Sequence, residues 1–203
     1  EVNPSATVMQ AIATALQCSP TETRHLFVLA GLTPGEIPPL SGCEMISDST
    51  RRLLDSLNPQ PASIQRPSFD IVAWNDSFSR LMGVDFAQMP DDERNCIYLY
   101  LTSPVWRSRL GSDDSVLPTF VAYFRAAMAE HRGEPFWENK LARFFAVSPE
   151  FEALWHKRYD VSGVENKIKT FTHPQAGEFM LQQMYWYSAP SNGSRLLVYL
   201  PVD

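Results

Sequence analysis

Residues 69–76 read FDIVAWND, and SFSRLMG follows directly at residues 77–83. The run from Phe69 to Trp74 predicts a short strand, because it is almost wholly apolar and ends in turn chemistry. The Asn75 side chain can accept a backbone N–H from the next turn of chain and so begin a helix. The segment that follows has apolar residues at i, i+3 and i+4, and Gly83 is suited to end it. The sequence therefore predicts a strand, a sharp corner and a short helix that covers a core.

The composition is that of a globular chain with a sizeable core. Of the 203 residues, 44% are hydrophobic and 20% are charged. A chain of this length buries roughly 70% of its unfolded surface, as one large or two small domains. The net charge of −6 argues against a general nucleic-acid binder, which normally carries a basic face. Aromatic residues make up 12% of the chain, and such residues fill a core or wall an apolar cavity.

The cysteine pattern favours a cytoplasmic protein. Cys18, Cys43 and Cys96 are odd in number and widely spaced, so they fit neither a disulfide framework nor a zinc site. No apolar run approaches the ~18–20 residues of a membrane span, and no signal peptide is evident, so we expect no membrane partner. Since the chain begins at Glu1 rather than at methionine, we expect a fragment of a longer protein.

The sequence divides into three predicted parts: two short helices in residues 1–32, a linker with a short helix in 33–60, and a main domain in 61–203. Asn3, before Pro4, is expected to cap the first helix. Ser19, with proline next and Glu22 three residues on, has the form of a capping box. The apolar residues expected to pack in this helical pair are Val8, Ile12, Ala15, Leu16, Leu26, Leu29 and Ala30.

The main domain is predicted to run from strands to helices and back to strands. Residues 62–75 favour two short strands joined by a tight turn. Helical periodicity follows in ERNCIYLYLTS (93–103), SVLPTFVAYFRAAMAEH (115–131) and FWENKLARFF (136–145), and a fourth helix is expected to begin at Ser148.

Three further strands are predicted in ENKIKTFTHP, GEFMLQQMYWYS and SRLLVYLPV, the last two joined by a Ser-Asn-Gly turn at 191–193. The strand at 178–187 is apolar on both faces, so we expect it to be covered on both sides. The fold class is therefore α+β, with an antiparallel five-stranded sheet covered by helices and preceded by a short helical segment.

These segments resemble a known family in their order and spacing. DIVAWNDSFSRLMG is similar to the start of a PAS domain. The runs P-x-S-I-x-R-x-x-F-D-I-V-A-W-N, PDDERN, SPEF-x-x-LW, HP-x-x-GEF and LLVYLP resemble the ligand-binding domain of MmyB-like transcription regulators. Residues 3–32 are similar to the last two helices of the helix-turn-helix module that precedes this domain in the family.

The resemblance implies a bacterial transcription regulator of the XRE type with a PAS-like sensor for a fatty-acid-like ligand. The helices that would enter the DNA groove are absent from the sequence, so we expect DNA binding only through helix-turn-helix helices missing from this chain. The apolar residues left over on the outer face of the predicted sheet favour a role in pairing, so we also expect a homodimer.

The pair Arg94 and Asn95 is the first candidate site. The helix dipole does not favour a positive side chain in the first turn of a helix, so Arg94 needs another reason to be there. Arg94 could grip a ligand carboxylate bidentately while Asn95 orients it. The alternative is structural: an ion pair of Arg94 with a neighbouring acidic residue, and a buried Asn95 that bridges backbone groups.

Aromatic and methionine side chains form the second candidate site. Trp74, with Asn75, could line a pocket mouth, or it could be part of the core beside an asparagine that only caps the helix. The remaining candidates are expected to face inward, either as core or around a long apolar cavity for a flexible chain. They are Tyr98, Phe120, Phe124, Met128, Phe145, Trp155, Met180 and Met184.

Catalysis and metal binding have little support in the sequence. His25, His131, His156 and His173 lack the close helical spacing of a metal site. No nucleophile elbow, phosphate-cradling loop or recognisable Cys–His pair is present. We therefore expect no enzyme and no cofactor other than a bound fatty acid or similar lipid. Two functions stay open: a sensor with an apolar cavity, and a dimerisation module whose core is filled.

Overall fold

The computed structural model describes residues 4–32, 46–110, 114–129, 131, 133–157, 160–187 and 193–202. Asn3, Cys43, residues 33–45 of the expected linker and the first two residues of the expected Ser-Asn-Gly turn lie outside them. The chain forms two compact units, one in residues 1–45 with 130–132 and one in 46–129 with 133–203, and each is described by itself. No helix in the described ranges is long and apolar enough to cross a membrane.

The N-terminal unit is a helical pair, α1 (Ala6–Ala15) and α2 (Pro20–Leu29). The hydroxyl of Ser5 accepts the Val8 backbone N–H and begins α1. The capping box expected at Ser19 and Glu22 is present: the Ser19 hydroxyl accepts the Glu22 N–H, and the Glu22 carboxylate accepts the Ser19 N–H.

The packing face predicted for this pair is wrong. The buried residues are Met9, Ala13 and Phe27, whereas Val8, Ile12, Leu16 and Leu29 are exposed. Both helices have apolar residues on more than one side, so periodicity alone does not select the side that meets the partner helix.

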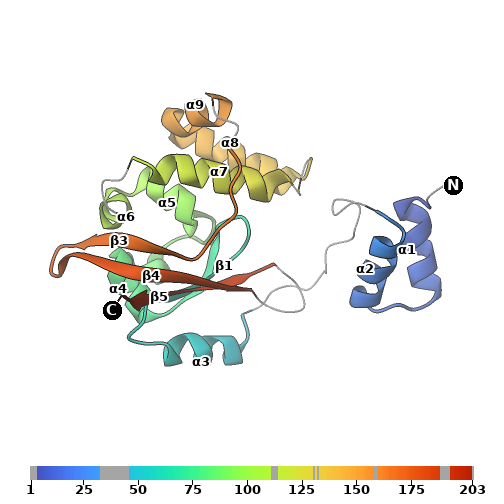
Figure 1. Cartoon of the computed structure of the whole chain (residues 1–203), viewed down its shortest axis with the longest axis horizontal. Helices are drawn as coiled ribbons and strands as arrows, with labels where there is room; N and C mark the ends of the chain where they lie inside the picture. Colours follow the sequence, from blue (N-terminus) through green and yellow to red (C-terminus); the bar gives the residue numbers. More distant parts are fainter. Residues whose placement is uncertain are drawn as a thin grey trace. The chain divides into compact units, whose positions relative to one another are not determined.

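The main unit is built on one antiparallel sheet with the strand order β2-β1-β5-β4-β3 (Figure 1). The strands are β1 (Ala62–Gln65), β2 (Ile71–Trp74), β3 (Lys167–His173), β4 (Gly177–Tyr187) and β5 (Arg195–Pro201). β1 pairs with β5, with Ile64 opposite Leu196, so the strands before and after the helical block join into one sheet. The predicted α+β class and five-stranded antiparallel sheet are confirmed.

The corner at Trp74 and Asn75 is formed as predicted. β2 begins at Ile71 rather than Phe69, because Phe69 has a left-handed φ of 68° that interrupts the strand. Asn75 caps α4 (Asp76–Met82), and its side-chain oxygen accepts the backbone N–H groups of Phe78 and Ala62, each at 3.0 Å. Gly83 ends α4 with a φ of 66°.

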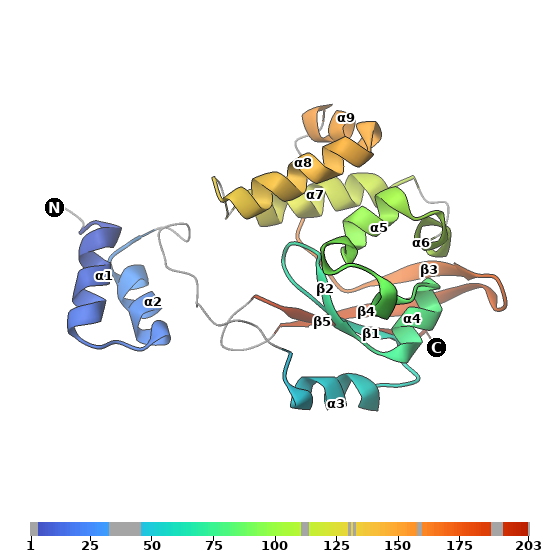
Figure 2. The same cartoon turned by 180° about the vertical axis from the view of Figure 1, so that it is seen from behind.

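Five helices follow α4 and lie on the same face of the sheet (Figures 1 and 2). They are α5 (Cys96–Thr102), α6 (Pro104–Arg109), α7 (Val116–Ala129), α8 (Pro135–Val147) and α9 (Pro149–Lys157). Their apolar faces and that face of the sheet share one large core that includes Phe78, Phe124, Phe171 and Tyr199. The sequence analysis missed α6, which starts at the Ser103-Pro104 step.

The opposite face of the sheet is covered by α3 (Asp48–Ser56), through a small core around Leu54, Ile64 and Val198. This helix lies in the range expected to be a linker, but it packs on the sheet as part of the main unit.

The prediction that β4 is covered on both sides is wrong within the described residues. On the α3 face of the sheet, Met180 is 56% exposed and Trp186 is 60% exposed. The nine residues of α3 pack over β1, β2 and β5, and this core does not extend to β3 and β4. Met180 therefore does not face inward.

Candidate ligand-binding site

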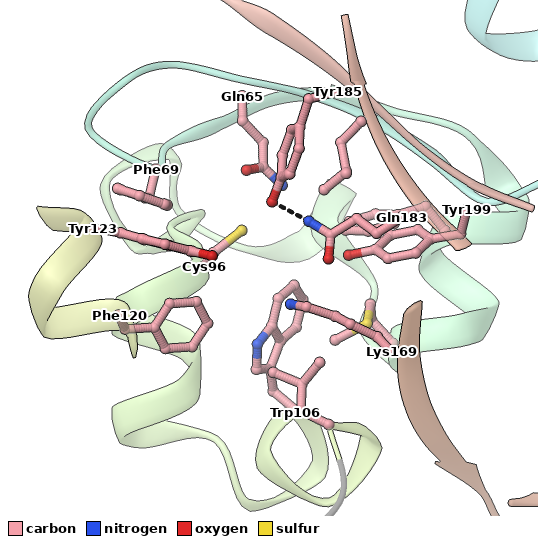
Figure 3. A pocket seen from close by; sticks show the side chains of 14 residues that line it. Gln65, Phe69, Cys96, Trp106, Phe120, Tyr123, Lys169, Gln183, Tyr185 and Tyr199 are labelled. Carbon is pink, nitrogen blue, oxygen red and sulfur yellow. Dashed lines mark hydrogen bonds between the residues drawn. The ribbon is translucent and has the colours of Figure 1, made fainter. Parts of the chain in front are cut away.

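A small hollow lies between the sheet and its helical layer, and we call it the inner chamber (Figure 3). Its volume, measured as the space open to the centre of a water molecule, is about 30 Å³. A single water needs roughly 10–15 Å³ by this measure, so the chamber has room for about two water-sized groups. Its walls are mostly aromatic and aliphatic, with side chains such as Phe69, Phe78, Phe120 and Leu197.

Two buried polar atoms that face the chamber have no hydrogen-bond partner among the described residues. They are the indole Nε1 of Trp106 on α6 and the amide Oε1 of Gln183 on β4. The two residues are 2% and 1% exposed. The Gln183 amide nitrogen donates to the Tyr185 hydroxyl (Figure 3). Native proteins seldom leave such groups unpaired, so each is a reason to expect a water or a ligand atom.

Among the described residues, Lys169 is the one charged side chain in the wall of the chamber. It is half-buried and projects from β3 into the hollow (Figure 3). It makes no ion pair or hydrogen bond to any described residue. Burial, helped by the positive charge of Lys167, lowers the pKa of Lys169 to about 8. At neutral pH the side chain is therefore still mostly an ammonium ion.

The Cys96 thiol and the Tyr185 and Tyr199 hydroxyls of the chamber are neutral at neutral pH. Burial raises the pKa of the Cys96 thiol to about 12, so the reactive thiolate is not populated at neutral pH. Burial also raises the pKa of Tyr185 and of Tyr199 above that of a free phenol. No acidic side chain is among the residues that line the chamber.

A larger open groove adjoins the chamber, and we call it the outer groove. It lies between the first half of α7 and β3 and has a volume of about 520 Å³, which is within the range of about 300–1,000 Å³ of small-molecule sites. Val116 and Thr119 on α7 and Lys167, Ile168 and Thr170 on β3 line it, with Glu178 of β4. The side chains shared by both hollows are Leu110, Phe120, Tyr123 and Lys169.

Most of the predicted site residues lie elsewhere in the core. Of the expected set, Phe120 lines both hollows. Phe124 on α7 contacts Trp155 on α9, and Phe145 on α8 contacts the same tryptophan, with ring centroids 6.1 and 6.2 Å apart. Met128 packs at the edge of this core. Tyr98 lies beneath the Arg143 guanidinium, and Met184 is half-buried on the α3 face of the sheet.

Asn95 caps α5 and Arg94 precedes it, so Arg94 is not in the first turn of the helix as predicted, and the two residues line neither hollow. Arg94 forms an ion pair with Asp91 at 2.7 Å, and its guanidinium lies 5.2 Å from the centroid of the Trp74 ring. Asn95 caps α5, and its side-chain oxygen accepts two backbone N–H groups. Its amide nitrogen donates to the backbone oxygen of Ser68 and to Asp70. These contacts match the structural alternative for Arg94 and Asn95, in which Arg94 is ion-paired with an acidic neighbour and Asn95 bridges backbone groups.

The sequence analysis missed Lys169, Trp106 and Gln183. A signal for Lys169 was present, because it alternates in register with Phe171 and so belongs to the buried face of an amphipathic strand. A lysine on the core side of a strand is unusual enough to mark a candidate site. Trp106 gave no such signal, since it lies on a helix that the analysis did not predict. In the described ranges, no cluster of His, Cys, Asp or Glu could hold a metal ion.

The chain matches the model of a known family. The model of the MmyB-like transcription regulator ligand binding domain matches residues 46–203. No curated protein matches the chain. The matched range begins two residues before α3 and contains the whole sheet, the inner chamber and the outer groove.

Proposed function

The chain belongs to the family of the MmyB-like transcription regulator ligand binding domain, and from this premise we propose that it is the sensor part of a bacterial, XRE-type helix-turn-helix regulator. Its ligand is an apolar small molecule of the fatty-acid class, and binding of that ligand modulates how the regulator holds DNA. The helix-turn-helix head, and not residues 46–203, makes the DNA contact.

The observation that carries this proposal is the shared wall between the outer groove and the inner chamber. Leu110, Phe120 and Tyr123 are common to both hollows, so a ligand in the groove needs to displace few side chains to reach the chamber. A change of rotamer in these aromatic side chains opens the pocket to the apolar chain of a ligand.

A ligand in the outer groove touches α7 and β3 together. It therefore favours the arrangement in which these two elements are held at the correct separation. Only such a difference in affinity between two arrangements can shift their populations and so change the regulator's output.

The second candidate function is a dimerisation module with a filled core. Two observations favour it. The inner chamber has room for about two water-sized groups. Met180 and Trp186 also leave an apolar surface on the α3 face of the sheet that a second copy could cover.

Organic-solvent extraction of the purified protein, followed by mass spectrometry of the extract, separates the two functions. A stoichiometric fatty acid or related lipid supports the sensor. An empty extract, together with no thermal shift on addition of C10–C18 acids or alcohols, contradicts the sensor and favours the dimerisation module.

A further inference from the structure

We propose that the inner chamber is a subsite for a carboxylate head group, held by the Lys169 ammonium and the Trp106 indole N–H, while the ligand's apolar tail lies in the outer groove. This assignment rests on the proposed sensor function and adds to it the charge of the ligand and its orientation. It also places the anchor on β3 and α6 rather than at Arg94.

The unpaired polar atoms of the chamber are the first argument. The Trp106 N–H is buried and donates to no described residue. The Lys169 ammonium projects into the same space and forms no ion pair with a described residue. Both are donors, so the missing group is an acceptor. The Gln183 amide adapts to it, because a half-turn of the amide exchanges its oxygen for an NH2 group that donates to the chamber.

The local charge is the second argument. The Arg195 guanidinium lies 4.5 Å from the ring centroid of Phe69 and 5.5 Å from that of Tyr185, two side chains that line the chamber. Its Nε and Nη2 atoms are buried without a partner among the described residues. Burial raises the pKa of the Cys96 thiol, while Arg195 and Lys169 both lower it, so both cations lie close to this wall.

Among the described residues, the acidic groups near the chamber do not offset these two cations. Asp70 also influences Cys96, but its carboxylate is 2.6 Å from the Lys140 ammonium and is already paired. Glu178 lies on the outer groove and is exposed to solvent. Net positive charge at a partly buried site favours an anion over an alcohol or an ester of the same shape.

The chamber accommodates the head group of a carboxylic acid, because it has room for about two water-sized groups. The carbon next to the carboxylate then lies at the wall shared by Phe120 and Tyr123, and the rest of the chain continues into the outer groove.

The test is isothermal titration calorimetry of the full chain with decanoic acid, decan-1-ol and methyl decanoate, each below its aggregation limit. We expect the wild-type protein to bind the acid at least about tenfold more tightly than the alcohol or the ester. Lys169→Met is expected to abolish this preference by weakening acid binding while leaving alcohol binding within about threefold. Lys157→Met is the matched control, because it removes one exposed positive charge from outside both hollows.

A spectroscopic readout on the unaltered protein accompanies the variants, so the result does not depend on their folding. The indole N–H resonance of Trp106, assigned with Trp106→Phe, is expected to move on addition of decanoate and not on addition of decanol. An acid that binds no better than the alcohol, with an unchanged Trp106 resonance, overturns the head-group assignment and leaves the apolar sensor intact. Loss of the acid preference in Arg94→Ala but not in Lys169→Met overturns it as well. If none of the three compounds binds, the proposed function itself fails.

Discussion

Lys140 Nζ on α8 lies 2.6 Å from Asp70 Oδ1 at the start of β2, and both side chains are nearly buried, at 12% and 13% exposure. The ion pair joins the helical layer to the sheet beside the inner chamber. Asp70 also accepts hydrogen bonds from the Ser68 hydroxyl and the Asn95 amide, so its carboxylate is fully engaged. A charge in this position is tolerated because it is paired.

Asp70→Asn is expected to lower the free energy of unfolding by about 3 kcal/mol, because it leaves the Lys140 ammonium buried and unpaired. Urea denaturation measures the change. In the double variant with Lys140→Met, the loss is expected to be smaller than the sum of the two single losses. Strict additivity, or a loss under about 1 kcal/mol in Asp70→Asn, contradicts a buried pair.

Asn75→Ala is expected to lower the free energy of unfolding by about 3 kcal/mol or more. The side chain accepts two backbone N–H groups and donates to the backbone oxygens of Leu54 and Gln60, all within a corner where Asn75 is 1% exposed. Ser47→Ala removes an exposed cap from α3 and serves as the matched control, with an expected cost of about 1 kcal/mol. Equal costs for the two variants would contradict the role of Asn75 as a tertiary link.

Gly83→Ala is expected to destabilise the protein more than Gly177→Ala does. Both glycines have positive φ values, 66° and 71°, so alanine carries a similar backbone strain of about 1 kcal/mol at each position. At Gly83, a Cβ would also lie 2.7 Å from Arg109 Nη2 and 3.1 Å from a Val105 methyl, whereas nothing lies within 4 Å at Gly177. Thermal denaturation of both variants compares the two sites directly.

Met82→Ala and Met180→Ala test which methionines face the core. Met82 is 1% exposed and lines the inner chamber, so its truncation is expected to cost about 2–4 kcal/mol. Met180 is 56% exposed on the opposite face, and its truncation is expected to change stability by less than about 0.5 kcal/mol. A large loss in Met180→Ala at low protein concentration would show that this face is covered.

The succession of strands and helices along the chain and the Asn75 corner were predictable because each depends on local chemistry. Each signal is contained in a short stretch of sequence: a cap residue, a helix stop, and the period of two along β4. The family's motifs then placed these elements in order, which periodicity could not do. It was harder to predict which strand faces are buried. β4 is apolar on both sides, and its sequence does not reveal that the core under α3 stops at β5.

The inner chamber was not predictable from local pattern. Its polar atoms come from β3, β4 and α6, three segments whose meeting is a property of the tertiary fold. The aromatic residues chosen instead, such as Phe124 and Phe145, have helical spacing, and spacing of this kind identifies a core without showing where the core is hollow. The unusual position of the Arg94 charge suggested contact with a ligand, but in the structure Arg94 forms a local ion pair with Asp91.

Lys169 is expected to make the stability of the wild-type protein rise with pH, relative to that of Lys169→Met, between about pH 8 and 10. In the folded chain burial holds the Lys169 pKa at about 8, below its ordinary value of 10.5. Between these values the unfolded chain keeps a proton that the folded chain has released. Because the unfolded state then binds more protons, the free energy of unfolding increases with pH.

Urea denaturation of both proteins at pH 7.5 and pH 9.5 isolates this contribution. The Cys96 thiol acts in the opposite direction, since its folded pKa is raised to about 12 from 9.0, and the buried Tyr185 and Tyr199 join it above about pH 10. These groups are present in both proteins, so the difference between wild type and variant reports on Lys169. If the difference in free energy of unfolding between wild type and variant does not change with pH, water solvates the Lys169 ammonium. The chamber would then hold no unpaired charge that a ligand could neutralise.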